Sequence, residues 1–295
     1  MSDFPNLAVW FKTAAKGDVS TLDHWVEKGL FGAPEQPDLS RLIDRVDYTN
    51  GKSTALCLAV EGYHESYARR LLGLSRCAPT PTSSGETPVG IAARTLRPDL
   101  LKALLMHGHS PNQSTLEGVG SQPLMRLIRV LKPGGHGLRR APASSLSRAL
   151  ACIEVLLAHG ANPAPEGEPT ALFHAVESQS WPLVKFFLDK GVPADARPAD
   201  PHAETPLHVA SARWVEADAT DPTSCTHQII GLLMAAGANP YLTVKENQGP
   251  WVNALDICPL LSGKAHFLAL ISDRAARELE AASPPPAAPA GTLRL

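Results

Sequence analysis

The feature that most constrains this fold is a helix-opening pattern that recurs along the middle of the chain. A polar residue is followed by Ala or Pro and then by an apolar helical segment, beginning at Thr54, Thr87, Gln122, Thr170 and Thr205. A second helical segment follows each opening and ends near a glycine, namely Gly73, Gly108, Gly160, Gly191 or Gly237. Two short helices cannot bury both of their faces alone, so each copy needs another copy beside it. The repetition predicts a stack of helix pairs.

The residue types at these positions have direct physical roles in a helix pair. A threonine hydroxyl at the helix start accepts a hydrogen bond from a free N–H of the first turn. Proline in that turn lacks an N–H that would have no partner there, and glycine after the second helix adopts the left-handed conformation that ends it. Paired leucines such as Leu71/Leu72 and Leu156/Leu157 are expected to fill the space between neighbouring copies.

A known family pattern occurs in three stretches of these repeats. Residues 205–210 read Thr-Pro-Leu-His-Val-Ala, and the Gly-Ala-Asn-Pro turn occurs at 160–163 and at 237–240. The pattern resembles the ankyrin repeat. The resemblance implies an all-α solenoid of stacked helix-turn-helix units with short β-hairpin fingers, about five central repeats and helical caps. It also implies that His208 forms hydrogen bonds between neighbouring units.

The chain divides into four parts on this interpretation. Residues 1–47 are expected to form an N-terminal helical cap and an irregular connector, and 48–240 the repeats. Two repeats carry insertions between their helices, at 131–147 and 213–224, where Gly, Pro, Ser and Asp indicate loops. Residues 241–282 are expected to form a C-terminal cap, followed by a disordered Pro/Ala-rich tail at 283–295.

Composition argues against several classes of function. The net charge of −2 gives no electrostatic basis for binding nucleic acid or an anionic membrane. No secretory signal or run of about 18 apolar residues occurs, which argues against export and membrane insertion. The five cysteines are scattered, as expected of reduced thiols in the cytoplasm. The richness in Ala and Pro is compatible with a bacterium whose genome is rich in G and C.

The sequence lacks the motifs of the common catalytic and metal sites. Gly51-Lys52-Ser53 ends like a P-loop, but Val46 stands where that motif requires glycine. The histidines beside Gly108 and Gly160 fit cations at helix C-termini. No nucleophile motif, zinc motif or carboxylate pair is present. We therefore expect no enzyme activity, no cofactor and no metal.

Candidate contact residues follow from the resemblance, because ankyrin-like chains usually bind proteins through finger tips and exposed positions of each first helix. Two loop or finger aromatics are added as anchors, since aromatic residues dominate interface energetics. Trp251 fits either packing or binding. The candidate protein-binding residues are Leu58, Glu61, Ile91, Arg94, Arg126, Arg129, Arg139, Arg140, His174, Glu177, Val209, Arg213, Trp214 and Tyr241.

Four of these candidates, Arg126, Arg129, Arg139 and Arg140, form the one local concentration of basic residues. They fit either an ordinary solvated surface or a patch that contacts an anion or an acidic partner.

Three functions remain open at this level. The first is a non-enzymatic protein-binding module, monomeric when alone, whose partner the sequence does not identify. The second is an immunity or antitoxin-like inhibitor whose insertions plug the active site of a toxin or enzyme. The third is a delivered effector with an unrecognised activity.

Overall fold

The structure is a computed structural model of the 295-residue chain. It describes residues 7–28, 42, 44–47, 53–74, 86–113, 122–131, 143–198, 200, 202–215, 218, 221–245 and 250–282. The chain forms two compact units, which are described separately. Unit 1 comprises Met1–Gln179 and Ala196–Pro198, and unit 2 comprises Ser180–Asp195 and Ala199–Leu295.

Unit 1 consists of helix pairs and one short hairpin. Its elements are α1 (Leu7–Lys16), α2 (Val19–Glu27), β1 (Val46–Asp47), β2 (Ser53–Thr54), α4 (Ala55–Glu61), α5 (Glu65–Leu74), α6 (Pro88–Arg94), α7 (Pro98–Met106), α8 (Pro123–Val130), α9 (Ala143–Ala158) and α10 (Ala171–Glu177).

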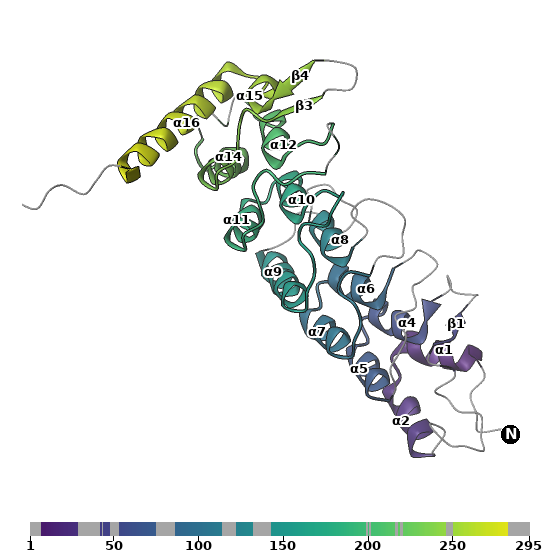
Figure 1. The fold of residues 1–295 in the computed structure, drawn as a ribbon. Helices are drawn as coiled ribbons and strands as arrows, with labels where there is room; N and C mark the ends of the chain where they lie inside the picture. Colours follow the sequence, from purple (N-terminus) through teal and green to yellow (C-terminus); the bar gives the residue numbers. More distant parts are fainter. Residues whose placement is uncertain are drawn as a thin grey trace, which may run out of the picture. The chain divides into compact units, whose positions relative to one another are not determined.

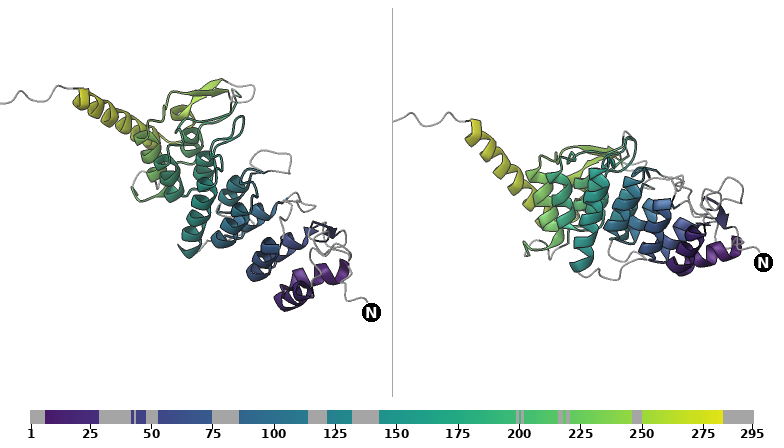
Figure 2. Two further views of the ribbon diagram at one scale, coloured as in Figure 1. Left: turned by 60° about the horizontal axis from the view of Figure 1, so that its bottom comes forward. Right: turned by 90° about the horizontal axis from the view of Figure 1, so that it is seen from below.

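The helices of unit 1 form two rows (Figures 1 and 2). The first helices α1, α4, α6, α8 and α10 contact one another in sequence order, and the second helices α2, α5, α7 and α9 do the same. The seam between the rows is apolar, with Leu71, Leu104 and Leu156 fully buried. The expected stack of helix pairs is confirmed.

The helix openings have the predicted chemistry. The hydroxyls of Thr54, Thr87 and Thr170 accept hydrogen bonds from N–H groups of the first turn, at 3.1–3.2 Å. Gln122 has the same extended backbone, but its side chain makes no capping hydrogen bond. Four of the five openings, with Thr205 in unit 2, are therefore capped as expected.

The glycine predictions are confirmed at four positions and wrong at one. Gly108, Gly160, Gly191 and Gly237 have φ between 80° and 93°, the left-handed conformation that ends a helix. Gly73 instead lies within α5, which continues to Leu74.

Both helices of the N-terminal pair bury aromatic residues. Trp10 and Trp25 are buried, and their ring centroids lie 5.9 Å apart. The turn between the helices places Gly17 at φ 65°. Most of the expected connector lies outside the described residues, although Val46 and Thr54 pair across the β1–β2 hairpin.

Unit 2 contains α11 (Trp181–Asp189), α12 (Pro206–Ala212), α14 (Cys225–Ala235), β3 (Thr243–Lys245), β4 (Trp251–Asn253), α15 (Ala254–Ile257) and α16 (Leu261–Ala282). Helix α14 packs on α11, α12 and α16, and α15 packs on α12 and α16. The β3–β4 hairpin pairs Val244 with Val252. Asn253 caps α15 and forms a capping box with Asp256.

The structure changes the interpretation of both insertions. Residues 143–147, expected to be part of a loop, belong to α9, and only 132–142 of the first insertion lies outside the described residues. In the second insertion Trp214 is buried. The predicted tail at 283–295 also lies outside the described residues.

Candidate protein-interaction surface

Four first helices of unit 1, α4, α6, α8 and α10, present one charged residue each at the same register. Glu61, Arg94, Arg129 and Glu177 all lie seven residues after the N-cap of their helix. Glu61 and Arg129 are exposed, and Arg94 and Glu177 are half-buried. These four residues are called the first-helix face below. Along the stack the two acids lie at the ends of the row and the two bases lie between them.

Residues four places after the N-cap lie deeper. Leu58 and Arg126 are half-buried, whereas Ile91 and His174 are buried. Positions three residues apart on a helix differ by about 60° around its axis, so the earlier position turns toward the neighbouring first helix. The sequence-based choice of Ile91 and His174 as contact residues is therefore corrected, and they belong to the interior.

An acidic residue that the sequence reasoning missed links the first helices. Glu86 precedes the cap residue of α6, and its Oε2 accepts a hydrogen bond from Arg94 Nη2 at 3.2 Å. Its Oε1 accepts from Nη2 of Arg126 on α8. An acid beside a helix N-terminus is favoured by the helix dipole, which is the one signal that the sequence offered.

The ion pairs along this face differ in strength. The Glu86 side chain is only 10% exposed, so its two pairs are held in a largely desolvated setting. Arg94 Nη2 and Glu61 Oε1 lie 4.0 Å apart, and the Glu61 side chain is 55% exposed. A pair as open as this contributes little to stability. Glu61 therefore remains available to a partner, while Glu86 fixes Arg94 and Arg126.

On α10, Nδ1 of His174 lies 3.1 Å from Oε2 of Glu177. His174 is buried, and its ring meets that of Phe173 edge-on at 5.8 Å. The histidine thus holds the half-buried Glu177 carboxylate in place at the end of the face.

Candidates in unit 2 divide between interior and surface. Val209 and Trp214 are buried, with Trp214 only 1% exposed, so the expectation that Trp214 is an accessible anchor is corrected. Its indole occupies the space between α14 and α16, which the loop-like sequence around it did not indicate. Arg213 is half-buried.

Two exposed aromatic residues of unit 2 lie in or just before the β3–β4 hairpin. Tyr241 is 58% exposed and Trp251 is 55% exposed, which favours binding over packing for Trp251. Trp251 lies opposite Lys245, whose carbonyl oxygen accepts a hydrogen bond from His202 Nδ1 at 2.7 Å. Arg139 and Arg140, the remaining candidates, lie outside the described residues.

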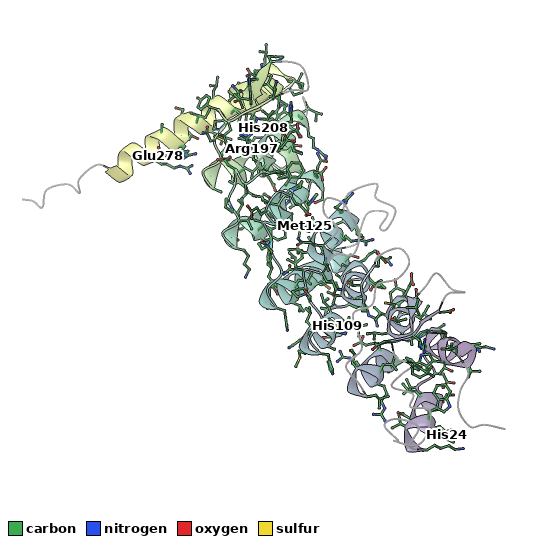
Figure 3. All side chains as sticks on the ribbon, turned by 45° about the vertical axis from the view of Figure 1, so that its right-hand side comes forward. His24, His109, Met125, Arg197, His208 and Glu278 are labelled. Carbon is green, nitrogen blue, oxygen red and sulfur yellow. The ribbon has the colours of Figure 1, made fainter. Side chains whose placement is uncertain are left out.

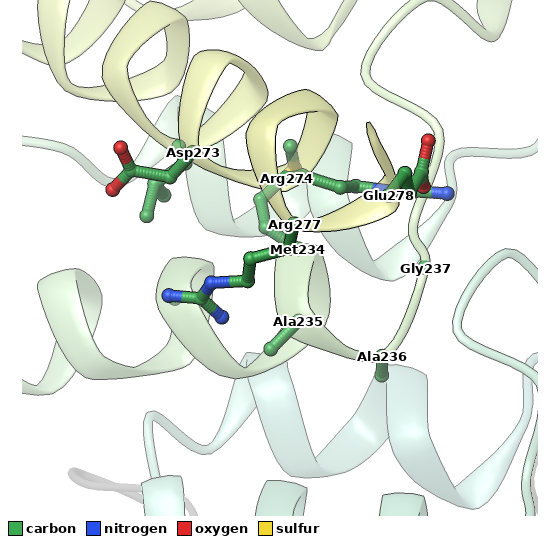
Figure 4. Close-up of a pocket in the computed structure, with 10 residues that line it drawn as sticks. Met234, Ala235, Ala236, Gly237, Asp273, Arg274, Arg277 and Glu278 are labelled. Carbon is green, nitrogen blue, oxygen red and sulfur yellow. The ribbon is translucent and has the colours of Figure 1, made fainter. Parts of the chain in front are cut away.

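A surface pocket in unit 2 lies between the C-terminal end of α14 and α16 (Figure 4). Arg274 Nη1 donates to the carbonyl oxygen of Ala238 at 3.3 Å, and its Nε donates to Glu278 Oε1 at 2.8 Å. A cation at the carbonyl end of a helix is stabilised by the helix dipole. Two of the charged residues that line this pocket, Arg274 and Glu278, are thus held by the packing of α16 on the end of α14.

Two buried histidines lie at helix ends, one at the start of α12 and one after α7. His208, labelled in Figure 3, shares a 2.6 Å hydrogen bond between its Nδ1 and Thr205 Oγ1, within its own helix start. His109 is buried at the end of α7, and burial lowers the pKa of its imidazole, followed in effect by the nearby His107.

Among the described residues, no three His, Cys, Asp or Glu side chains are grouped so as to hold a metal ion. In the same part of the chain, every helix is too short or too polar to span a bilayer.

Comparisons with known proteins identify the fold. No family model matches the sequence, and no curated protein matches it. The human ASB11 ankyrin repeat domain shares 22% identity and a TM-score of 0.58, covering 88% of this chain and 96% of that one. The ankyrin repeat domain of Bcl-3, a member of the IkappaB family, shares 18% identity and a TM-score of 0.59, covering 88% and 97%.

An ankyrin repeat domain from Acinetobacter baumannii AYE shares 20% identity and a TM-score of 0.56, covering 78% of this chain and 98% of that one. All three solved structures are ankyrin repeat domains, and their repeats extend over most of the present chain. The chain has the ankyrin-repeat fold, as the motif at 205–210 indicated.

Proposed function

We propose that this ankyrin-repeat chain is a non-enzymatic module that binds a partner protein through the first-helix face of unit 1. The observation that carries the proposal is the row of charged residues at one register of successive helices, Glu61, Arg94, Arg129 and Glu177. Repeat proteins use surfaces built by stacking to hold other macromolecules. The partner protein acts in the same compartment, which the cysteine pattern suggests is the cytoplasm, and the chain alone is monomeric.

Two properties of this row support the proposal. Glu86 fixes Arg94 at the centre of the row by an ion pair, so fewer side chains of the row need to become ordered when a partner binds. Arg129 and Glu61 are exposed and free to form new ion pairs. Such complementary charges set the choice of partner and the rate of association more than the bare affinity.

The test exchanges charges without changing the net charge. The double variant Glu61→Lys/Arg129→Glu reverses the two exposed residues of the row. Its matched control, Lys102→Glu/Glu154→Lys, reverses two exposed residues on α7 and α9. A partner is first captured from native lysate and identified, and its Kd for each variant is then measured by calorimetry.

We expect the first-helix exchange to weaken binding by at least about tenfold, which corresponds to about 1.4 kcal/mol, and the control exchange to leave it within about twofold. Equal losses in both double variants would contradict the proposal. Replacement of 133–142 by a Gly/Ser linker tests the inhibitor alternative, in which the insertion plugs a partner's active site. If the linker variant loses binding while the Glu61/Arg129 exchange leaves the Kd unchanged, the partner binds the insertion and not the first-helix face.

A further inference from the structure

Three aromatic rings from different segments of unit 2 lie against one another. Trp214, which follows α12, stacks on His266 of α16 with ring centroids 5.1 Å apart and an interplanar angle of 25°. His266 in turn lies 4.1 Å from His227 of α14, and Trp214 lies 5.9 Å from His227. These three residues are called the histidine stack below.

The histidine stack lies where α16 begins to pack on the rest of unit 2. Trp214 Nε1 donates a hydrogen bond to Ser262 Oγ at 3.3 Å. Gly263 approaches so closely that a Cβ there would lie 2.3 Å from Cys258 Sγ and 2.9 Å from the indole of Trp214. The first turn of α16 is therefore fitted against Trp214, and the next turn carries His266.

The stack suits neutral imidazoles and disfavours charged ones. The Nε2 atom of His266 is buried and has no hydrogen-bond partner among the described residues. Burial lowers the pKa of His266, and the proximity of His227 lowers it further. Cation–π attraction between a protonated imidazole and Trp214 opposes this effect.

The charged and titratable groups around the stack come from each neighbouring segment. The segment after α12 contributes Arg213 and Asp218; the carbonyl oxygen of Asp218 lies 3.2 Å from His227 Nδ1, and its carboxylate accepts from Val215 N at 2.8 Å. Asp221 precedes α14 and interacts electrostatically with His227. Cys258 follows α15, and Lys264 lies on α16 near it.

We propose that the histidine stack is a pH-sensitive contact that holds the start of α16 on α14 at neutral pH and releases it in mild acid. His266 has a lowered pKa in the folded chain, so the unfolded or released state binds the proton more tightly. The stabilisation is thus fully present above about pH 6.5, the ordinary value for histidine, and is lost as the pH falls below it. Release uncovers Trp214 and the α14 surface that α16 covers.

Hydrogen exchange tests the release directly. Protection of backbone amides in 261–272 is measured by mass spectrometry at pH 7.5 and 5.5, with correction for the intrinsic pH dependence of exchange. We expect protection in the wild-type chain to fall severalfold at pH 5.5, up to about tenfold, which is the limit for one histidine whose pKa in the released state is the ordinary 6.5. Helix α6 in unit 1, which contains no histidine, is the internal control and keeps its protection.

The double variant His227→Phe/His266→Phe keeps aromatic rings in the stack and removes both titrating groups. Its 261–272 segment is expected to keep the same protection at both pH values. An equal acid-induced loss in the wild type and the double variant would overturn the proposal, and so would no loss in the wild type.

If the double variant does not fold, an NMR titration of the wild-type imidazoles decides the question. A His266 midpoint below 6.5 that coincides with shifts of the α16 amides supports the proposal, and a midpoint at or above 6.5 overturns it.

Discussion

Arg126 on α8 donates a hydrogen bond from Nη2 to Oε1 of Glu86, which precedes α6, so that a single side-chain contact joins two consecutive repeats. The other oxygen of the same carboxylate accepts from Arg94 on α6. Glu86 is buried between them. Glu86 and the two arginines therefore form an interior set of charges that supports the stack. The exposed charges of the first-helix face, Glu61 and Arg129, remain open to a partner.

Removing the charge of Glu86 is expected to destabilise unit 1. In Glu86→Gln the two guanidinium groups lose their shared anion while remaining partly buried, which costs about 1–3 kcal/mol of unfolding free energy. Glu61→Gln is the matched control, because Glu61 is exposed and only 4.0 Å from Arg94, and it should change stability by less than about 0.5 kcal/mol. Urea unfolding measures both. Equal stabilities of the two variants would contradict the interior role of Glu86.

Gln122 is the one helix opening among the five that lacks a capping hydrogen bond, and its Oε1 is buried without a partner among the described residues. Its backbone has φ −61° and ψ 147°, close to the values at the threonine caps. Gln122→Thr should therefore stabilise the chain by about 1 kcal/mol, and Thr87→Ala should destabilise it by about the same amount. Thermal and urea unfolding would show both shifts. A destabilised Gln122→Thr variant would show that the glutamine has another role.

Alanine substitutions at Gly17 and Gly160 distinguish the cost of steric crowding from the cost of backbone strain. Both have positive φ, but a Cβ on Gly17 would lie 2.3 Å from the ring of His64, whereas a Cβ on Gly160 meets nothing within 4 Å. Gly160→Ala should cost about 1–2 kcal/mol for the left-handed conformation alone, and Gly17→Ala at least about 1 kcal/mol more, because it also overpacks His64. The excess should shrink in a His64→Ala background. Equal costs for the two glycine variants would argue against the crowding.

The fold could be predicted from local residues because each repeat encodes its own boundaries. Thr54, Thr87, Thr170 and Thr205 cap their helices as expected. Gly73 was the exception, since a glycine near a helix end does not need positive φ. The left-handed residues Tyr63, Leu96 and Gln179 carried no such signal, because nothing in their side chains marks that conformation.

The surface was harder to predict because burial depends on contacts between repeats. Ile91 and Val209 share the register of Leu58 and Arg126, yet they are buried. Trp214 lies in a segment rich in Asp, Thr and Pro, and its burial depends on α16, about 50 residues further along the chain. Glu86 is a single acid in an unremarkable stretch, and only the folded chain brings both arginines to it.

The cysteines provide a chemical test of the same burial pattern. Burial raises the pKa of Cys57 to about 11 and that of Cys152 to about 12, so at pH 8 their thiolate fractions are about 10⁻³ and 10⁻⁴. Cys225 is exposed at the first residue of α14. Iodoacetamide at pH 8 should modify Cys225 at least about 100-fold faster than Cys57 or Cys152, because the reagent alkylates only the thiolates that it can reach. Peptide mass spectrometry measures the three rates. In concentrated urea the difference should disappear. Rapid native modification of Cys57 would show that the seam around α4 opens readily.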